Sequence, residues 1–209
     1  MLIENLCNYL TKKIRNKMPE VDDERAEVIN YGLQLVIGEI PKTFILLIAA
    51  YFLGILKLTI IGLLLILPYR TFSGGFHLKT HIGCIVATSS FYMGNVLLSK
   101  AIIFGNEYVK YMTIFAVWVF SMLMIKLYAP ADTENVPILR EKDRALKRML
   151  SYITMTLTLI ASVIIKDNII SNILIFGVLI QTLTITRFVY KLTNNKYGHE
   201  LYNELPKTA

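Results

Sequence analysis

Apolar residues occur along this chain in long blocks that contain almost no charge. The clearest blocks are Ile82–Leu98, Tyr111–Ile125, Met149–Ile165 and Ile169–Thr186. A helix needs about 20 mostly apolar residues to cross a bilayer, and several blocks reach that length with their flanks. The pattern therefore predicts membrane-spanning helices over about 82–99, 108–127, 149–166 and 168–190.

The region before these spans is less regular. From Val28 to Leu56 the chain is apolar but contains Pro41, which predicts one long kinked helix because proline removes a backbone hydrogen bond. Lys57 is expected to mark a turn. The next apolar run, Leu58–Leu67, covers only about 15 Å as a helix. It is therefore either a half-helix or part of a helix that continues into the following segment.

The N-terminal residues 1–18 have a different pattern. Leu2, Leu6, Leu10, Ile14 and Met18 recur at helical spacing, while polar and basic residues lie off this stripe. Such a pattern is typical of an amphipathic helix that lies in the membrane interface, so membrane lipid is an expected partner.

Basic residues cluster beside the apolar segments, and their positions predict the topology. The polar loop Ala129–Arg148 carries five of them near its end, which places that loop in the cytoplasm; they are Arg140, Lys142, Arg144, Lys147 and Arg148. With both termini also cytoplasmic, six crossings satisfy every charge. Four crossings are the alternative if residues 28–67 form re-entrant pieces. The predicted fold is an all-α, polytopic transmembrane bundle.

We expect one integral membrane domain over residues 1–209, with the bundle at 28–190 and a cytoplasmic tail at 191–209. Composition agrees, because 55% of the residues are hydrophobic, only 18% are charged and the mean hydropathy is +0.52. A soluble domain would carry closer to a quarter charged residues. The net charge of +7 is explained by topology, and no nucleic-acid motif is visible. Residues 1–20 lack the apolar core of a cleavable signal peptide. Two cysteines are too few for a disulfide framework.

The segment from Pro68 to Cys84 is out of character for a simple span, because it gathers a Gly-Gly pair, an arginine, two histidines and a cysteine. Cys84 with a nearby histidine suggests a thiolate nucleophile and its base. His81 is three residues from Cys84 and would be adjacent on a helix. His77 would be about 10 Å away along a continuous helix, so it can reach Cys84 only from a loop that folds back. Spacing alone leaves both histidines open.

Other residues of this segment are weaker candidates. Arg70 is suited to a carboxylate or a carbonyl group, and Ser73 to orienting a histidine. Gly74 and Gly75 give the backbone freedom that a folded-back loop requires. Oxyanion donors are expected either from the backbone near Gly83–Cys84 or from Arg70. No metal-site or phosphate-loop motif is visible, so we expect no metal and no cofactor.

The residues Arg70-x-x-Ser73-Gly74-Gly75-x-His77, with Cys84 seven positions later, resemble the signature of the accessory gene regulator B (AgrB) family. A second block, Tyr128-Ala-Pro-Ala-Asp-Thr-Glu-Asn-Val-Pro-Ile138, resembles that family's polar loop. These proteins are bacterial membrane endopeptidases of peptide quorum sensing. The resemblance implies that His77 and Cys84 are the catalytic pair and that His81 is not.

The resemblance also implies the substrate and the location. The expected partner is an AgrD-like precursor with an amphipathic leader, a central signal sequence and an acidic tail. The enzyme would remove the tail and leave a cyclic thiolactone or lactone, at the cytoplasmic membrane of a bacterial cell. The basic run Arg140–Arg148 would attract the acidic tail. A non-catalytic peptide exporter is the alternative function, and whether the chain forms a homo-oligomer stays open.

Overall fold

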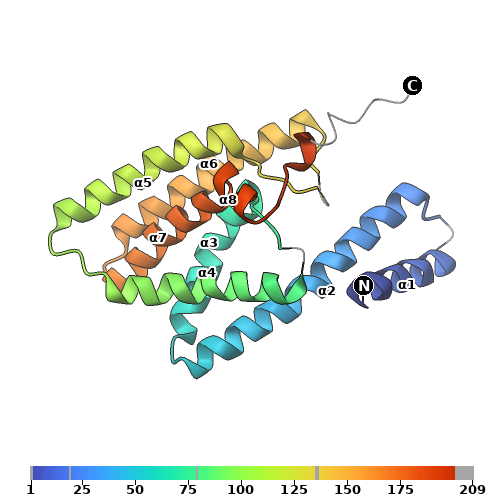
Figure 1. The fold of residues 1–209 in the computed structure, drawn as a ribbon, viewed down its shortest axis with the longest axis horizontal. Coiled ribbons are helices and arrows are strands. Elements are labelled where there is room, and N and C mark those ends of the chain that lie inside the picture. The colour runs from blue at the N-terminus through green and yellow to red at the C-terminus, as the bar shows by residue number, and fades with distance from the viewer. Residues whose placement is uncertain (1, 19, 79, 135–136, 201–209) are drawn as a thin grey trace. The chain divides into compact units, whose positions relative to one another are not determined.

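The computed structural model describes residues 2–18, 20–78, 80–134 and 137–200, and these form two compact units, Met1–Ala49 and Ala50–Ala209 (Figure 1). Helices dominate both units. Within the described ranges, the one pairing of extended backbone is an isolated parallel bridge between Gly74 and Ala131. The predicted all-α fold is therefore confirmed.

The first unit contains α1, Leu2–Lys17, and most of α2, Asp23–Phe52. Arg15 pairs with Asp23 at 2.6 Å, and the Asn30 amide donates to the Asn8 side chain at 2.5 Å. Asp22 caps the start of α2 by accepting from the Arg25 amide. The predicted N-terminal helix is thus present. Pro41 lies inside α2, which continues past it.

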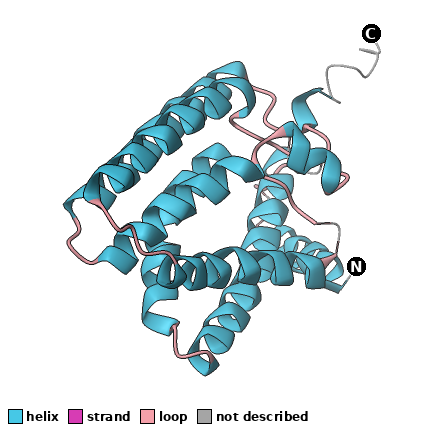
Figure 2. Cartoon of the chain, turned by 60° about the vertical axis from the view of Figure 1, so that its left-hand side comes forward, coloured by secondary structure: helices cyan, strands magenta, loops and turns pink. Residues whose placement is uncertain are grey.

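The second unit is a bundle in which α7 is the central helix. It packs against α3, α4, α5 and α6 and also meets the short α8, and residues on all sides of it are buried. Figure 2 shows the same chain turned by 60° and coloured by secondary structure. The helices of this unit are α3 Leu56–Ser73, α4 His81–Ala101, α5 Glu107–Tyr128, α6 Glu141–Ile164, α7 Asn168–Thr184 and the short α8 Arg187–Leu192. Polar side chains begin several of them: Thr80 caps α4, Asn106 caps α5 and Asp167 caps α7.

The bundle is apolar outside and contains many small polar residues inside. Leu64, Met112, Phe115, Leu123 and Leu157 are all more than half exposed. The buried residues include Ser73, Asn95, Ser99, Ser121, Ser162, Ser171, Asn172, Gln181 and Thr182. Hydrogen bonds between helices satisfy several of these groups, as in other membrane bundles. An apolar surface of this kind is stable in contact with lipid. A soluble protein would have charged side chains at these positions.

The helices α3, α4 and α5 are each long and apolar enough to cross a membrane, and α7 is a shorter apolar helix. The chain is therefore a membrane protein. The number of crossings and the cytoplasmic side of the termini remain predictions.

Several predicted boundaries were wrong. The turn after α2 lies at Gly54, where φ is +67°, and Lys57 already belongs to α3. For the short apolar run, the second of the two predicted alternatives is confirmed, because it continues as a helix through Pro68 to Ser73. The basic run 140–148 is not a loop, because α6 begins at Glu141.

The predicted span 168–190 ends early, at Thr184. The side chains of Thr184 and Thr186 bond to the carbonyls of Gln181 and Leu183, which competes with continued helix. Thr186 has an extended backbone and becomes the cap of α8.

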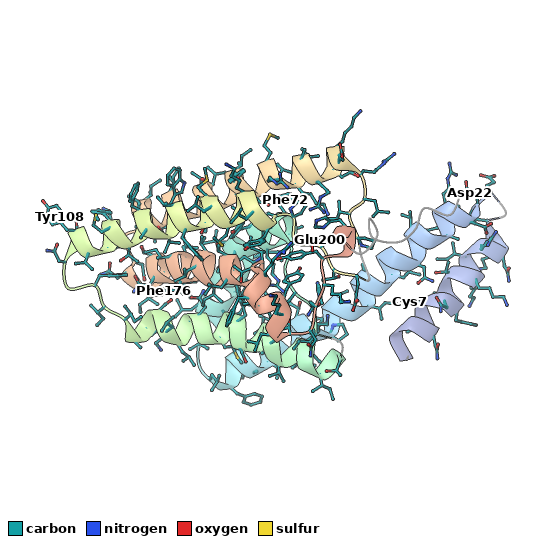
Figure 3. All side chains as sticks on the ribbon, turned by 45° about the horizontal axis from the view of Figure 1, so that its top comes forward. Cys7, Asp22, Phe72, Tyr108, Phe176 and Glu200 are labelled. Carbon is teal, nitrogen blue, oxygen red and sulfur yellow. The ribbon has the colours of Figure 1, made fainter. Side chains whose placement is uncertain are left out.

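The two ends of the bundle differ. At one end the last residues of α3, α5 and α7 meet the first turns of α4 and α6. At the other end the Asn172 amide donates to the Ile102 carbonyl, and the Ser171 hydroxyl donates to the Ser162 carbonyl. Tyr108 and Glu200 mark these opposite ends in Figure 3. The residues of the predicted site lie at the first end.

Candidate active site

His77 and Cys84 come together where α3 passes into α4. Cys84 lies in the first turn of α4, and His77 lies on the loop before that helix. The Cys84 sulfur is 4.0 Å from His77 Nδ1. The loop therefore folds back over the helix start, as a pairing of these two residues requires. His81 is the first residue of α4, and its side chain lies outside the described part of the chain.

The turn that carries His77 is anchored to a second loop. The Gly75 amide donates to the Ala131 carbonyl at 3.0 Å, and the Ala131 amide donates to the Ser73 carbonyl at 2.8 Å. Gly74 has φ +74°, and a Cβ on it would lie 2.2 Å from the Ala131 oxygen. Both the backbone conformation and the close approach therefore require glycine at position 74.

The loop that holds this turn is itself fixed from two sides. Arg148 of α6 donates through Nε to the Ala129 carbonyl at 2.8 Å. The Tyr190 hydroxyl contacts the carbonyls of Ala131 and Asp132 at 3.0 and 3.1 Å. Burial raises the pKa of Tyr190 far above its usual value, so this side chain remains a neutral donor.

The side chain of Asp132 is fully buried and accepts four hydrogen bonds. Two come from the backbone amides of Ile138 and His199, at 2.9 and 3.0 Å. The others come from Arg144 at 3.3 Å and from His199 Nδ1 at 2.6 Å. Arg144 also donates toward His199 Nε2, which places the ring proton on Nδ1. The C-terminal residues 195–200 are therefore part of the frame around the site.

Gln181 of α7 joins the site from the bundle interior. Its Nε2 donates to the Ser73 hydroxyl at 2.9 Å and to the Gly74 carbonyl at 2.8 Å. Its Oε1 accepts from Arg70 NH1 at 3.0 Å. The residue is completely buried. Ser73, predicted to orient a histidine, is buried and contacts Gln181.

Arg70 and Cys84 line the same small cavity of about 20 Å³, which has room for little more than a water molecule. The remaining walls include Phe76, Leu78, Phe91, Tyr92 and Thr184. The Arg70 guanidinium lies 5.7 Å from the centre of the Phe91 ring, a cation–π contact. The cavity thus places a fixed positive charge beside the thiol.

The backbone amides proposed as oxyanion donors already have partners. The Gly83 amide donates to the Thr80 hydroxyl at 3.1 Å, and the Cys84 amide donates to the Thr80 carbonyl at 3.0 Å. Of the predicted donors, this leaves Arg70 to face a bound carbonyl.

The predicted tail-binding residues have divided roles. Arg144 and Arg148 turn inward to the polar loop, where they support structure. Arg140 precedes α6, and Lys142 and Lys147 lie in its first two turns; Arg140 and Lys142 are exposed. Among the described residues, no three His, Cys, Asp or Glu side chains are grouped as metal ligands.

Sequence reasoning missed four residues of this site, namely Asp132, Gln181, Tyr190 and His199. Asp132 lies inside the block that carried the family resemblance. Gln181 is a polar residue in an apolar helix, and such residues often have a functional role. Tyr190 and His199 carry no local sequence signal that distinguishes them from other tyrosines and histidines.

Comparison with known proteins identifies the family. The family model of accessory gene regulator B matches residues 3–185. The chain belongs to the accessory gene regulator B family. Its relatives include an AgrB-like protein of Clostridium acetobutylicum, 26% identical over 99% of this chain and 95% of the relative. AgrB-like proteins of Listeria innocua and Listeria monocytogenes are 29% and 28% identical, each over 96% of this chain and 95% of the relative. No solved structure matches.

Membership of the AgrB family gives this membrane protein a role in processing the peptide of agr-type quorum sensing, with an AgrD-type precursor as its partner. The block from Arg70 to Cys84 and the polar loop that follows Tyr128 both lie inside the matched region. In the bundle these two blocks are hydrogen-bonded neighbours, although the bonded residues, Ser73 or Gly75 and Ala131, are 56 to 58 positions apart in sequence.

Proposed function

We propose that this protein is a membrane cysteine endopeptidase that removes the C-terminal tail of an AgrD-like precursor and cyclises the remaining peptide. The observation that carries the proposal is the 4.0 Å approach of His77 Nδ1 to the Cys84 sulfur at the start of a membrane helix. Catalytic hydrogen bonds are often long before substrate binds and tighten afterwards. A helix N-terminus also favours negative charge within its first turn, where Cys84 lies.

The first step is acyl transfer to the enzyme. His77 takes the proton of Cys84, and the thiolate attacks the carbonyl carbon of the bond that joins signal sequence and tail. When the tetrahedral intermediate collapses, the C–N bond breaks and the imidazolium gives its proton to the departing amine. The tail leaves with a free amino group, and the signal sequence is held on Cys84 as a thioester.

The second step closes the ring. A thiol or hydroxyl of the bound peptide loses its proton to His77 and attacks the thioester carbonyl. The bond to Cys84 breaks, and the product is a thiolactone or lactone. No water is consumed in this route. Attack by water would give a linear peptide instead.

Access of water decides between these outcomes. Exchange of one thioester for another is nearly balanced in free energy, whereas hydrolysis runs downhill. Apart from Arg70 and two threonines, the cavity beside Cys84 has aliphatic and aromatic walls, and its volume is only about 20 Å³. Such a site restricts water, and holding both ends of the peptide raises the effective concentration of the internal nucleophile. The exposed residues Arg140 and Lys142 are suited to attract an acidic tail.

The decisive experiment is mass spectrometry of the intact protein and its peptides after co-expression with the precursor. We expect an adduct on Cys84 with the mass of the tail-less precursor. Cys84→Ala should give no adduct and no cleavage while it inserts normally, and His77→Ala should not accumulate adduct. The precursor is weighed in the same sample, because fast cyclisation would leave Cys84 unmodified.

The outcome that overturns the proposal is a full-length precursor in the presence of correctly inserted wild-type protein. Export of an already processed peptide that tolerates Cys84→Ala would support a transporter instead. Ser90→Ala, an exposed position on the same helix, is the matched control and should cleave as the wild type does.

A further inference from the structure

Gln181 is a buried amide whose three side-chain hydrogen bonds all go to residues of the candidate site. A buried primary amide without partners costs several kcal/mol in an apolar environment, so its partners fix its position. Those partners lie on α3 and the turn after it, 107 to 111 residues away in sequence. The contact therefore belongs to the tertiary structure of the site rather than to the helix that carries it.

The orientation of the amide is determined by its neighbours. Nε2 faces two acceptors, the Ser73 hydroxyl and the Gly74 carbonyl, while Oε1 faces the Arg70 guanidinium. A flipped amide would direct its NH2 group at a cation and its oxygen at a carbonyl. Only one of the two orientations is favourable, and in it the oxygen draws Arg70 toward Gln181.

Arg70 is held on two sides at the wall of the cavity that Cys84 also lines. Gln181 accepts one N–H, and the face of Phe91 lies 5.7 Å from the guanidinium carbon. A guanidinium has five N–H donors, so most of them are left for a ligand. The amides of Gly83 and Cys84, the rival donors, already bond to Thr80.

We propose that Gln181 is the positioning residue of this site: it aims Arg70 at the carbonyl oxygen of the bond that Cys84 attacks. In the tetrahedral intermediate that oxygen becomes an anion, and a pre-oriented guanidinium stabilises it more than the neutral carbonyl. The same amide donates to the Ser73 hydroxyl and the Gly74 carbonyl, at the end of the helix that carries Arg70. The proposal rests on the proposed peptidase function.

The test compares Gln181→Leu and Gln181→Glu with the wild-type protein in membranes. Leucine removes both the acceptor and the donor, and we expect kcat for precursor cleavage to fall about 100-fold with little change in KM. Glutamate keeps an oxygen for Arg70, so its loss of kcat should be smaller. Alkylation of Cys84 by iodoacetamide, measured by peptide mass, needs no oxyanion donor and should stay within twofold of wild type.

Chemical rescue separates aiming from mere folding. Ethylguanidinium at millimolar concentration should restore part of the cleavage lost in Arg70→Ala, because Gln181 still offers its oxygen in the vacated space. It should restore none in Arg70→Ala combined with Gln181→Leu. Asn95→Leu, which also removes a buried amide between helices, is the matched control and should cleave normally per folded molecule.

Two results would overturn the inference. One is wild-type kcat in Gln181→Leu. The other is independence of the two residues, seen either as equal rescue with and without Gln181 or as losses in Arg70→Ala and Gln181→Leu that multiply in the double variant. A wild-type protein that leaves the precursor uncut would instead reject the peptidase function itself, so the two failures are distinguishable.

Discussion

At the scale of single residues, the geometry of the site requires particular residue types at particular positions. Gly74 is the clearest of them, because it has φ +74° and lies against the Ala131 oxygen. Its amide also closes α3 by bonding to the Arg70 carbonyl at 3.0 Å. A single glycine thus ends the helix that carries Arg70 and starts the loop that carries His77.

We predict that Gly74→Ala lowers precursor cleavage at least tenfold. The backbone of Gly74, with φ +74° and ψ −152°, is essentially restricted to glycine and costs alanine on the order of 1–3 kcal/mol. The new methyl group would also lie 2.2 Å from the Ala131 oxygen, so the two loops must separate. Cleavage is measured per inserted molecule. Gly94→Ala, where a Cβ meets nothing within 4 Å, is the control and should be fully active. Equal activity of both variants would show that the loop pairing does not matter.

At the scale of elements, sequence predicted the helices better than the contacts between them. The spans expected at 82–99 and 108–127 are the helices His81–Ala101 and Glu107–Tyr128. Hydropathy finds such helices because each must be apolar along its length to lie in lipid. It could not find the end of α7 at Thr184, since threonine hydroxyls bond to the local backbone without changing the apolar average.

Only part of the candidate site could be predicted from the sequence, because several of its contacts join residues that are far apart in the chain. Spacing left His77 and His81 both open, and the family resemblance selected His77, whose ring lies 4.0 Å from the Cys84 sulfur. Gln181 bonds to Ser73 across 108 positions of sequence. No local pattern encodes a contact of that range. His199 and Asp132 are likewise 67 positions apart.

The polar loop and the C-terminal segment behave as one structural element through Asp132. We predict that Asp132→Asn loosens both, because charge-assisted bonds to a carboxylate contribute about 1.5–3 kcal/mol each and two of the donors are Arg144 and His199. Digestion at Lys196 by a lysine-specific protease should become at least tenfold faster, and precursor cleavage should fall.

The exposed Glu134 supplies the comparison for that variant. Glu134→Gln removes the same charge from the same loop and should change neither digestion nor cleavage. If Asp132→Asn is digested no faster than Glu134→Gln, the buried carboxylate does not hold the C-terminal segment. If digestion at Lys196 is faster while precursor cleavage is unchanged, the site does not need the contact between the polar loop and the C-terminal segment.

At the scale of the whole molecule, one end of the bundle holds both the site and most of the basic residues. Arg70, Arg140, Arg144, Arg148 and Arg187 lie there, at or near the ends of helices. The opposite end carries Lys57, Lys100, Lys110 and Lys166 with Glu107 and Asp167, which is a smaller excess of basic residues. The positive-inside rule therefore predicts that the site lies at the cytoplasmic face, where a newly made precursor would first meet the membrane.

This topology predicts a labelling pattern for single cysteines introduced into the Cys7→Ser, Cys84→Ser protein. A membrane-impermeant maleimide added to intact cells should label Asn106→Cys and Lys166→Cys, which lie at the turns between α4 and α5 and between α6 and α7. Glu141→Cys, at the start of α6, should react only after the cells are permeabilised. Labelling of Glu141→Cys in intact cells would place the site on the outer face.

The number of crossings is decided by one further position. Leu53 lies at the turn between α2 and α3 and is 56% exposed. With six crossings this turn is outside, because α3 then runs from the outer face to the cytoplasmic end, where Arg70 lies. Its 18 residues form about 27 Å of helix, close to the thickness of the hydrocarbon core. Leu53→Cys should then be labelled in intact cells. With four crossings and re-entrant pieces, it would stay unlabelled until the membrane is opened, because the chain would enter with α2 and return with α3 to the same cytoplasmic face.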